Sequence, residues 1–214
     1  MQYKPLCFRK RDIVLHADDG ISDIFYIKNG YVRVYRISEL GEELTLSILK
    51  PGDLFPMLWE VKDAPNPYYM EAITDLEVWR FPRDQFLSFV KDRPDLFYDL
   101  TSNLMVRFGG MLNRMEYLIT SRAYNKVAAT LFTCAKRFGV KQKDEVIVDV
   151  PLTHKDIATL VGITRETTCL EMKKLERKGL ISHLGRLLVI KDMKRLEAES
   201  QLNNEFEEPL YYSL

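Results

Sequence analysis

The stretch that decides the fold is LTHKDIATLVGITRETTCLEMKKLERKGLI, residues 152–181. Thr153 is followed three residues later by Asp156, which is the spacing of a capping box at the start of a helix. Apolar residues recur behind it until Gly162, which is a stop signal. Ala158 lies four residues before Gly162, and two small residues at this spacing allow helices to cross closely. The stretch therefore predicts a short helix that ends in a tight turn.

A second helix is predicted to run from an N-cap at Thr164 to a stop at Gly179. Along it Thr168, Met172 and Leu175 recur at i, i+4 and i+7, so they form one buried stripe. The side chains on the opposite face of this helix are then expected to be exposed to solvent: Arg165, Glu166, Cys169, Leu170 and Lys173. Two helices joined in this way have helix-turn-helix geometry, whose second helix fits a DNA major groove.

Two short strands are predicted next, at residues 180–181 and 187–190. The polar bend between them, residues 183–186, contains Gly185. A hairpin in this place is the wing of a winged helix-turn-helix. The competing interpretation of residues 153–178, an ordinary pair of amphipathic helices, explains neither the hairpin nor the local charge.

The charge of the chain is segregated, although its total is neutral with 31 Lys and Arg against 31 Asp and Glu. Residues 121–195 carry 16 Lys and Arg against 8 Asp and Glu, whereas the segment from Leu196 onward has five Glu and no base. The first 120 residues are therefore slightly acidic. A basic module on an acidic body is expected to bind a phosphate backbone, with an affinity that falls steeply with salt.

The first part of the chain, residues 12–82, predicts β structure because short apolar runs alternate with turn signals. Five strands are expected: Ile13–Leu15, Ile24–Ile27, Tyr31–Ile37, Leu44–Leu49 and Val78–Phe81. Polar and apolar residues alternate within them, which predicts Arg33 and Thr45 on the solvent face and Leu44 in the core. Many short strands at this spacing indicate a sandwich or jelly roll.

After Pro82 the period changes, and residues 94–120 predict one long helix. Its apolar residues form one continuous stripe and part of a second, so one stripe is free to pair with a twin helix. The residues expected to pair are Leu100, Leu104, Phe108, Met111, Met115 and Leu118. The alternative is that the helix packs wholly within its own domain. Gly109-Gly110 indicates a bend or a close backbone approach.

Several classes of protein are not expected from this sequence. The three cysteines are scattered and odd in number, so we expect neither a disulfide framework nor a Cys-rich metal site. The three histidines lie in different segments, and no phosphate loop or nucleophile elbow is present, so no metal and no enzyme activity are predicted. No apolar run has the length of a membrane span or a signal peptide, which predicts a cytoplasmic protein.

The order of β roll, long helix and winged helix-turn-helix is similar to that of a known family. The chain resembles the CRP/FNR superfamily of bacterial transcription regulators over nearly its whole length. The residues that carry the resemblance are the Gly30 turn, the Leu49–Asp53 turn, Pro94-Asp95 and, most specifically, VGITRETT at residues 161–168.

The resemblance implies an α+β fold and assigns a structure to each part of the chain. Residues 1–93 would form a β-roll sensor domain, a double-stranded β-helix or jelly roll. Residues 94–120 would form a dimerisation helix, residues 121–196 a winged helix-turn-helix domain, and residues 197–214 an acidic tail. Family members are homodimers that read palindromic DNA with half-sites about 34 Å apart, and RNA polymerase is the further partner implied.

The resemblance also implies which residues contact DNA. Arg165 and Glu166 would meet base edges or phosphates, since Arg pairs with guanine and Glu accepts from cytosine N4. Cys169 and Leu170 would take two further reading positions. Leu170 departs from the family, which usually has Arg there, and offers only an apolar contact such as one to a thymine methyl group. The full expected set is Thr153, His154, Thr164, Arg165, Glu166, Thr167, Cys169, Leu170, Lys173 and Arg186.

The effector site departs further. Members that bind cyclic nucleotides have Gly-Glu-Leu and, later, Arg-Ser/Thr-Ala, where this chain has residues 55–58 (FPML) and a region near residues 69–72 (YMEA). A phosphate would then meet the carboxylate of Glu71 and lose a charge-assisted pair. The polar positions of the dimer helix that face the base correspond to Met111 and Leu112. We therefore expect that cAMP does not bind.

The nature of the signal stays open at this point. Cys7 stands alone, which does not fit an iron-sulfur cluster, and no cofactor is predicted. A candidate effector pocket, which could equally be a filled core, comprises Phe55, Met57, Trp59, Tyr68, Tyr69, Glu71, Met111 and Leu112. The alternative function is a ligand-binding β-roll protein whose helical module contacts proteins, but such a module would not need the basic excess.

Overall fold

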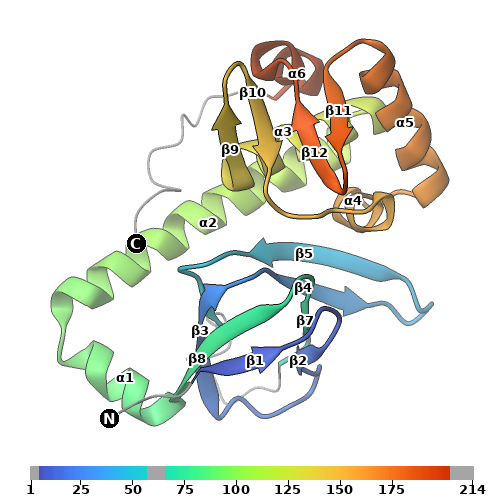
Figure 1. Ribbon diagram of the computed structural model, residues 1–214. Coiled ribbons are helices and arrows are strands. Elements are labelled where there is room, and N and C mark those ends of the chain that lie inside the picture. The colour runs from blue at the N-terminus through green and yellow to red at the C-terminus, as the bar shows by residue number, and fades with distance from the viewer. Residues whose placement is uncertain (1–4, 57–65, 203–214) are drawn as a thin grey trace. The chain divides into compact units, whose positions relative to one another are not determined.

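The computed structural model describes residues 5–56 and 66–202 (Figure 1). The chain divides into two compact units, the first up to Ser102 and the second from Asn103 onward. The division falls inside the long helix α2, Pro94–Thr120. Among the described residues, no helix is both long enough and apolar enough to cross a membrane. The predicted α+β class is confirmed.

The first unit contains two antiparallel four-stranded sheets, followed by helix α1 (Arg83–Lys91). One sheet has the order β1 (Leu6–Phe8), β8 (Leu76–Pro82), β3 (Asp23–Asn29) and β6 (Leu54–Phe55). The other has the order β2 (Ile13–Leu15), β7 (Tyr69–Ala72), β4 (Val32–Ile37) and β5 (Glu43–Leu49). The five predicted strands are all present, whereas β1, β6 and β7 were not predicted.

The core of this unit is a cluster of apolar side chains from both sheets. Its buried members are Phe25, Ile27, Val32, Leu49, Phe55, Met70, Ala72, Leu76 and Val78. The turn at Gly30 has a φ of +91°, and a Cβ there would lie 2.3 Å from the Asp75 carbonyl oxygen. Only glycine therefore fits this turn.

The predicted alternation is wrong on two neighbouring strands. The pairing of β4 with β5 skips Leu46, which forms a bulge and reverses the side-chain pattern of β5. As a result Thr45 is fully buried and Leu44 is 45% exposed. Arg33 is also buried, at 6% exposure, because two carboxylates pair with it.

The second unit is built around helix α3 (Ala123–Phe138), which packs against three other helices. These are α4 (His154–Val161), α5 (Arg165–Arg177) and α6 (Met193–Ser200). A four-stranded sheet has the order β11 (Ile181–Leu184), β12 (Leu187–Ile190), β10 (Glu145–Val148) and β9 (Gly139–Gln142). The hairpin β11–β12 is the predicted wing, while α3, β9 and β10 were not predicted.

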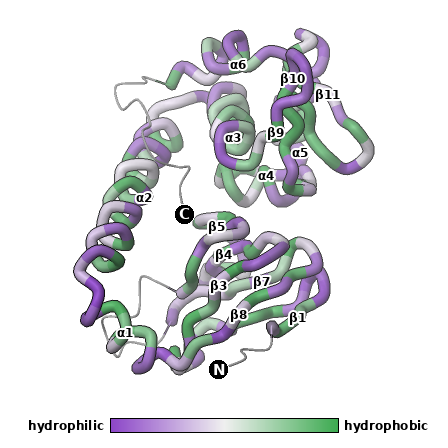
Figure 2. The backbone as a smooth tube through the Cα atoms, turned by 60° about the vertical axis from the view of Figure 1, so that its left-hand side comes forward, coloured by the Kyte–Doolittle hydropathy of each residue, from purple (hydrophilic) through white to green (hydrophobic). Residues whose placement is uncertain are grey.

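Helix α2 has the predicted bounds, and hydrophobic residues recur along it among hydrophilic ones (Figure 2). Tyr117 is its only buried residue. In the single chain much of the predicted pairing stripe is exposed: Leu104 is 37%, Phe108 56%, Met111 55% and Met115 57% exposed. The helix runs on through Gly109, where a Cβ would have no atom within 4 Å, so the single chain contains no close approach at this residue.

The last helix extends beyond the expected start of the acidic tail. Helix α6 continues to Ser200, and both Leu196 and Ser200 are fully buried. Glu199 forms an ion pair with Lys178 at 2.8 Å, and its main-chain oxygen accepts a hydrogen bond from Asn125. The predicted boundary between the winged helix-turn-helix domain and the tail, after residue 196, is therefore wrong, because it lies inside helix α6. The expected tail from residue 203 onward lies outside the described residues.

Candidate nucleic-acid interface

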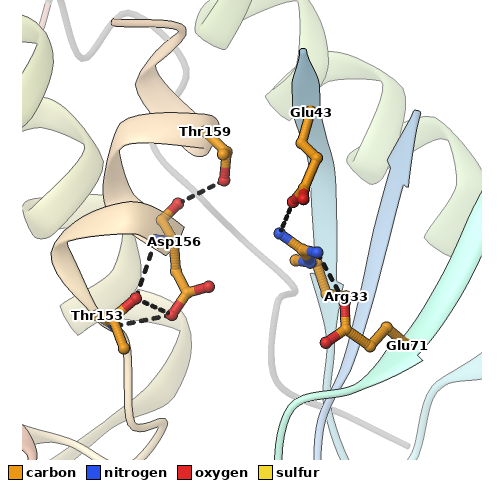
Figure 3. Close-up of polar contacts among 6 residues, drawn as sticks. All are labelled: Arg33, Glu43, Glu71, Thr153, Asp156 and Thr159. Atoms are coloured by element: carbon orange, nitrogen blue, oxygen red, sulfur yellow. Dashed lines mark hydrogen bonds and ion pairs between the residues drawn. The ribbon is translucent and has the colours of Figure 1, made fainter. Parts of the chain in front are cut away.

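The capping box at the start of α4 is present as predicted (Figure 3). The Thr153 main-chain N–H donates to Asp156 Oδ2 at 2.8 Å, and the Asp156 N–H donates to Thr153 Oγ1 at 3.2 Å. At the other end Gly162 has a φ of +73°, and its N–H donates to the Ala158 carbonyl at 2.8 Å. A Cβ at Gly162 would meet no atom within 4 Å. The predicted close crossing at this glycine is therefore wrong, and its backbone conformation is what the turn requires.

Helix α5 begins at Thr164, whose Oγ1 accepts a hydrogen bond from the Thr167 N–H at 3.1 Å. The predicted stripe is confirmed, since Thr168, Met172 and Leu175 are buried at 0–1% exposure. The Thr168 hydroxyl donates a hydrogen bond to the Thr164 carbonyl at 3.0 Å, so this buried polar group has a hydrogen-bond partner. The start of α5 is thus fixed, and its main-chain N–H groups and positive dipole end favour an anion.

The outward face of α5 consists of Arg165, Glu166, Cys169, Leu170 and Lys173. All are exposed except Cys169, which is half-buried. Arg165 and Lys173 form no ion pair with any described residue. Their charges are therefore not neutralised within the described part of the chain and can pair with phosphates or base edges.

The wing places Arg186 in the turn between β11 and β12, next to Gly185 with its φ of +61°. Arg186 is exposed and, within the described ranges, has no acidic partner. His183 Nδ1 lies 3.1 Å from Glu176 Oε1, which joins the wing to α5. The His154 ring packs edge-on to His183, with centroids 6.3 Å apart. The structure thus places His154, at the start of α4, against His183 of the wing hairpin that also carries Arg186.

One contact between the long helix α2 and the helix-turn-helix was not predicted from the sequence. Arg114 Nη2 of α2 donates to the Leu160 carbonyl of α4 at 2.5 Å, at the end of the helix where carbonyls lack partners. Tyr117, one turn further along α2, is 8% exposed, and burial raises its pKa. The end of α2 is therefore anchored directly to the first helix of the motif.

The first unit contains a buried charge cluster that was also missed (Figure 3). Arg33 Nη1 lies 2.8 Å from Glu43 Oε2, and Arg33 Nη2 lies 2.6 Å from Glu71 Oε2. The guanidinium carbon lies 4.1 Å from the centroid of the Tyr35 ring, a cation–π contact. Burial alone lowers the pKa of Arg33, but hydrogen bonds and charges of Glu71 and Glu43 raise it above its ordinary value.

The structure describes only part of the candidate effector pocket, for which a filled core was the equal alternative. Phe55 is 1% exposed and stacks on Phe25 at 5.2 Å, so it is core and not pocket lining. Glu71 is committed to Arg33 instead of offering a free carboxylate, which corrects the reason given for phosphate repulsion. Tyr69 stacks on Tyr35 at 5.3 Å.

The remaining residues of the predicted pocket belong to different parts of the chain. Met57 and Trp59 lie outside the described residues. Tyr68 is half-buried, and its main chain is held by the amide of Asn66, a fully buried residue that sequence reasoning did not single out. Met111 and Leu112 are exposed residues of the second unit.

Two family models match the chain. One describes a cyclic nucleotide-binding domain and matches residues 5–93. The other describes a Crp-like helix-turn-helix domain and matches residues 125–199. The second match covers α4, α5 and the wing hairpin.

Similar curated proteins and solved structures are also transcriptional regulators. The transcriptional regulator SdrP of Thermus thermophilus is 31% identical over 199 residues, which cover 91% of this chain and 94% of that protein. The CRP-like cAMP-activated global transcriptional regulator of Mycobacterium tuberculosis is 29% identical, covering 91% of this chain and 87% of its own. A solved transcriptional regulator of the CRP/FNR family from Thermus thermophilus superposes with a TM-score of 0.73 at 25% identity, over 92% of this chain and 98% of that chain.

Proposed function

Since the chain belongs to the CRP/FNR family of transcriptional regulators and has a Crp-like helix-turn-helix DNA-binding domain, we propose that it reads a two-fold symmetric operator as a homodimer. The observation that carries the proposal is the outward face of α5, where Arg165 and Lys173 are exposed and lack acidic partners among the described residues. The alternative, a helical module that contacts proteins, is not favoured by the Crp-like match.

Each expected DNA contact has a chemical role in this proposal. Arg165 would pair with guanine, and Glu166 would accept from cytosine N4. Lys173 and Arg186 would neutralise phosphates, because both are exposed cations without acidic partners in the described ranges. The first turns of α4 and α5 would hold phosphates at their N-termini, with Thr153, His154, Thr164 and Thr167 lining them and Cys169 and Leu170 facing the groove.

The proposed dimer contact is the exposed apolar stripe of α2. Leu104, Phe108, Met111 and Met115 are between 37% and 57% exposed in the single chain. Burying these side chains against the same helix of a second copy removes apolar surface from water, at about 25 cal/mol per Å². Gly109, with open space around its Cβ position, would allow the two backbones to approach closely. The dimer would act on RNA polymerase in the cytoplasm, as the family resemblance implies.

For the signal, we propose that the β roll does not bind cAMP. The relative from Mycobacterium tuberculosis is named cAMP-activated. This chain has FPML at residues 55–58 and YMEA at residues 69–72, where members that bind cyclic nucleotides have Gly-Glu-Leu and Arg-Ser/Thr-Ala. The guanidinium of Arg33 is already paired with two carboxylates, so it cannot offer a free bidentate site. Phe55 belongs to the buried core of the β roll, in agreement with the alternative of a filled core.

The proposed route of regulation runs through the long helix. A signal in the β roll would change how two α2 helices pair, and Arg114 would pass the change to α4 through the Leu160 carbonyl. A coupling free energy of about 1–3 kcal/mol changes affinity by roughly 5- to 150-fold, which suffices for a useful switch.

The experiment that tests the function is selection of bound duplexes from a random DNA library by the purified protein. It is run at two salt concentrations, with and without cAMP. Enrichment of the same two-fold symmetric site with and without cAMP, weaker at high salt, is expected. Enrichment only with cAMP would overturn the proposal for the signal, and no enrichment in any arm would contradict the proposed DNA reading.

A matched pair of variants tests the base contacts. R165A should relax one position of each half-site, at a cost of about 1–3 kcal/mol in discrimination. R36A, which removes an exposed arginine of β4 in the first unit, should select the same site as the unaltered protein. An unchanged site for R165A would remove the base contact from Arg165.

A further inference from the structure

Leu170 stands apart from the other residues of α5. It is 60% exposed, and within α5, every residue of which the structure describes, it is the only large apolar side chain left exposed. Leaving such a side chain in water is unfavourable in the free protein. A single exposed leucine is common on protein surfaces, so exposure alone does not indicate a binding surface; what matters is where Leu170 lies on α5.

The geometry of the helix places Leu170 on the face proposed to enter the groove. Successive residues of an α-helix are separated by about 100°, so Leu170 lies on the side opposite the buried Thr168, Met172 and Leu175. Glu166, one turn earlier, and the following Lys173 are both exposed on the same side.

From this placement we propose that Leu170 reads the 5-methyl group of a thymine in the major groove; the proposal rests on the proposed function. The side chain has no donor or acceptor, and the thymine methyl is the apolar feature that a base pair presents in the major groove. Opposite cytosine or guanine the same side chain would take a polar base edge out of water without a hydrogen bond, which is unfavourable. Leu170 thus selects for thymine and against the other bases.

The helix spacing also places this thymine in the half-site. Leu170 is four to five residues beyond Arg165 and Glu166, which is about 6–8 Å along the helix axis. This distance corresponds to about two base pairs at roughly 3.4 Å each. The half-site should therefore contain a thymine about two base pairs from the position that R165A relaxes.

The test uses the operator recovered by selection and replaces each thymine of a half-site by uracil, which lacks only the methyl group. For the unaltered protein, uracil at one of these positions should weaken binding about fourfold, as expected for the loss of about 0.8 kcal/mol per methyl group. The same change in both half-sites should weaken binding about 15-fold. Changing a cytosine at that position to 5-methylcytosine should partly restore binding. L170A should bind the thymine and uracil duplexes equally well.

A matched control is available in the first unit. Leu40 is 88% exposed between β4 and β5, so L40A makes the same chemical change far from α5 in the sequence. L40A should bind the uracil operator as much more weakly than the thymine operator as the unaltered protein does. Equal binding of thymine and uracil operators by the unaltered protein would overturn the Leu170 proposal while leaving the regulator function intact. A uracil penalty retained by L170A would assign the methyl contact to another residue. The absence of any preferred operator would instead contradict the proposed function.

Discussion

Replacing Arg33 by methionine should destabilise the first unit strongly, although the change removes no apolar packing. Arg33 joins β4 to β5 through Glu43 at 2.8 Å and to β7 through Glu71 at 2.6 Å. In R33M, the two carboxylates remain close together without their cation, and their side chains are only 25% and 15% exposed. Partly buried charges without a partner are poorly solvated and repel each other.

The magnitude follows from these exposures. Removing one partner of a buried pair costs about 3–5 kcal/mol, and we expect the lower end, about 3 kcal/mol, because both carboxylates reach some water. E71Q leaves Arg33 paired with Glu43 and should cost less, about 2 kcal/mol. The double variant R33M/E71M should recover most of the loss, since only Glu43 is then left without a cation and it is the more exposed carboxylate.

The assay is urea unfolding followed by tryptophan fluorescence. Both tryptophans of the chain, Trp59 and Trp79, belong to the first 102 residues, so the signal reports on the first unit. K28M is the control: its exposed pair with Glu77, also at 2.8 Å, should contribute less than about 1 kcal/mol. Equal midpoints for R33M and K28M, or a double variant no more stable than R33M, would refute the account of the cluster.

Three further predictions concern single residues. G30A should lower the free energy of unfolding of the first unit by about 2–3 kcal/mol, because alanine strains the turn at φ +91° and contacts Asp75; a normal urea midpoint would count against this. T153A should cost about 1 kcal/mol in thermal unfolding followed by circular dichroism, and T153S should restore it. Burial raises the pKa of Cys134 to about 11, so iodoacetamide at pH 8 should label exposed Cys7 but not Cys134 in peptide mass spectra. Because the unfolded thiol ionises near pH 9, the same shift makes stability fall as pH rises from about 9 to about 11.

The features predicted correctly from the sequence rest on local chemistry. The cap at Thr153 and the cap at Thr164 depend on residues three positions away, so their spacing can be recognised directly. The buried stripe of α5 and the bounds of α2 follow from helical periodicity over many residues. These elements determine where α5 begins and which of its side chains face outward.

The features that were missed depend on residues distant in the chain. Arg33 is buried because of carboxylates 10 and 38 residues away, and nothing in its own strand indicates them. The bulge at Leu46 shifts the pattern of β5 by one position, which alternation cannot foresee. Arg114 reaches a carbonyl 46 residues away, although in the sequence it is an ordinary polar residue of an amphipathic helix.

The central claim, that a symmetric pair of these chains reads two half-sites, is tested most directly by changing the distance between the half-sites. Five base pairs inserted between the halves of the selected operator rotate one half by about half a helical turn, since a turn contains about 10–10.5 base pairs. We predict a loss of specific affinity for the lengthened operator to about that of a single half-site. Equal affinity for the original and the lengthened operator would contradict the claim.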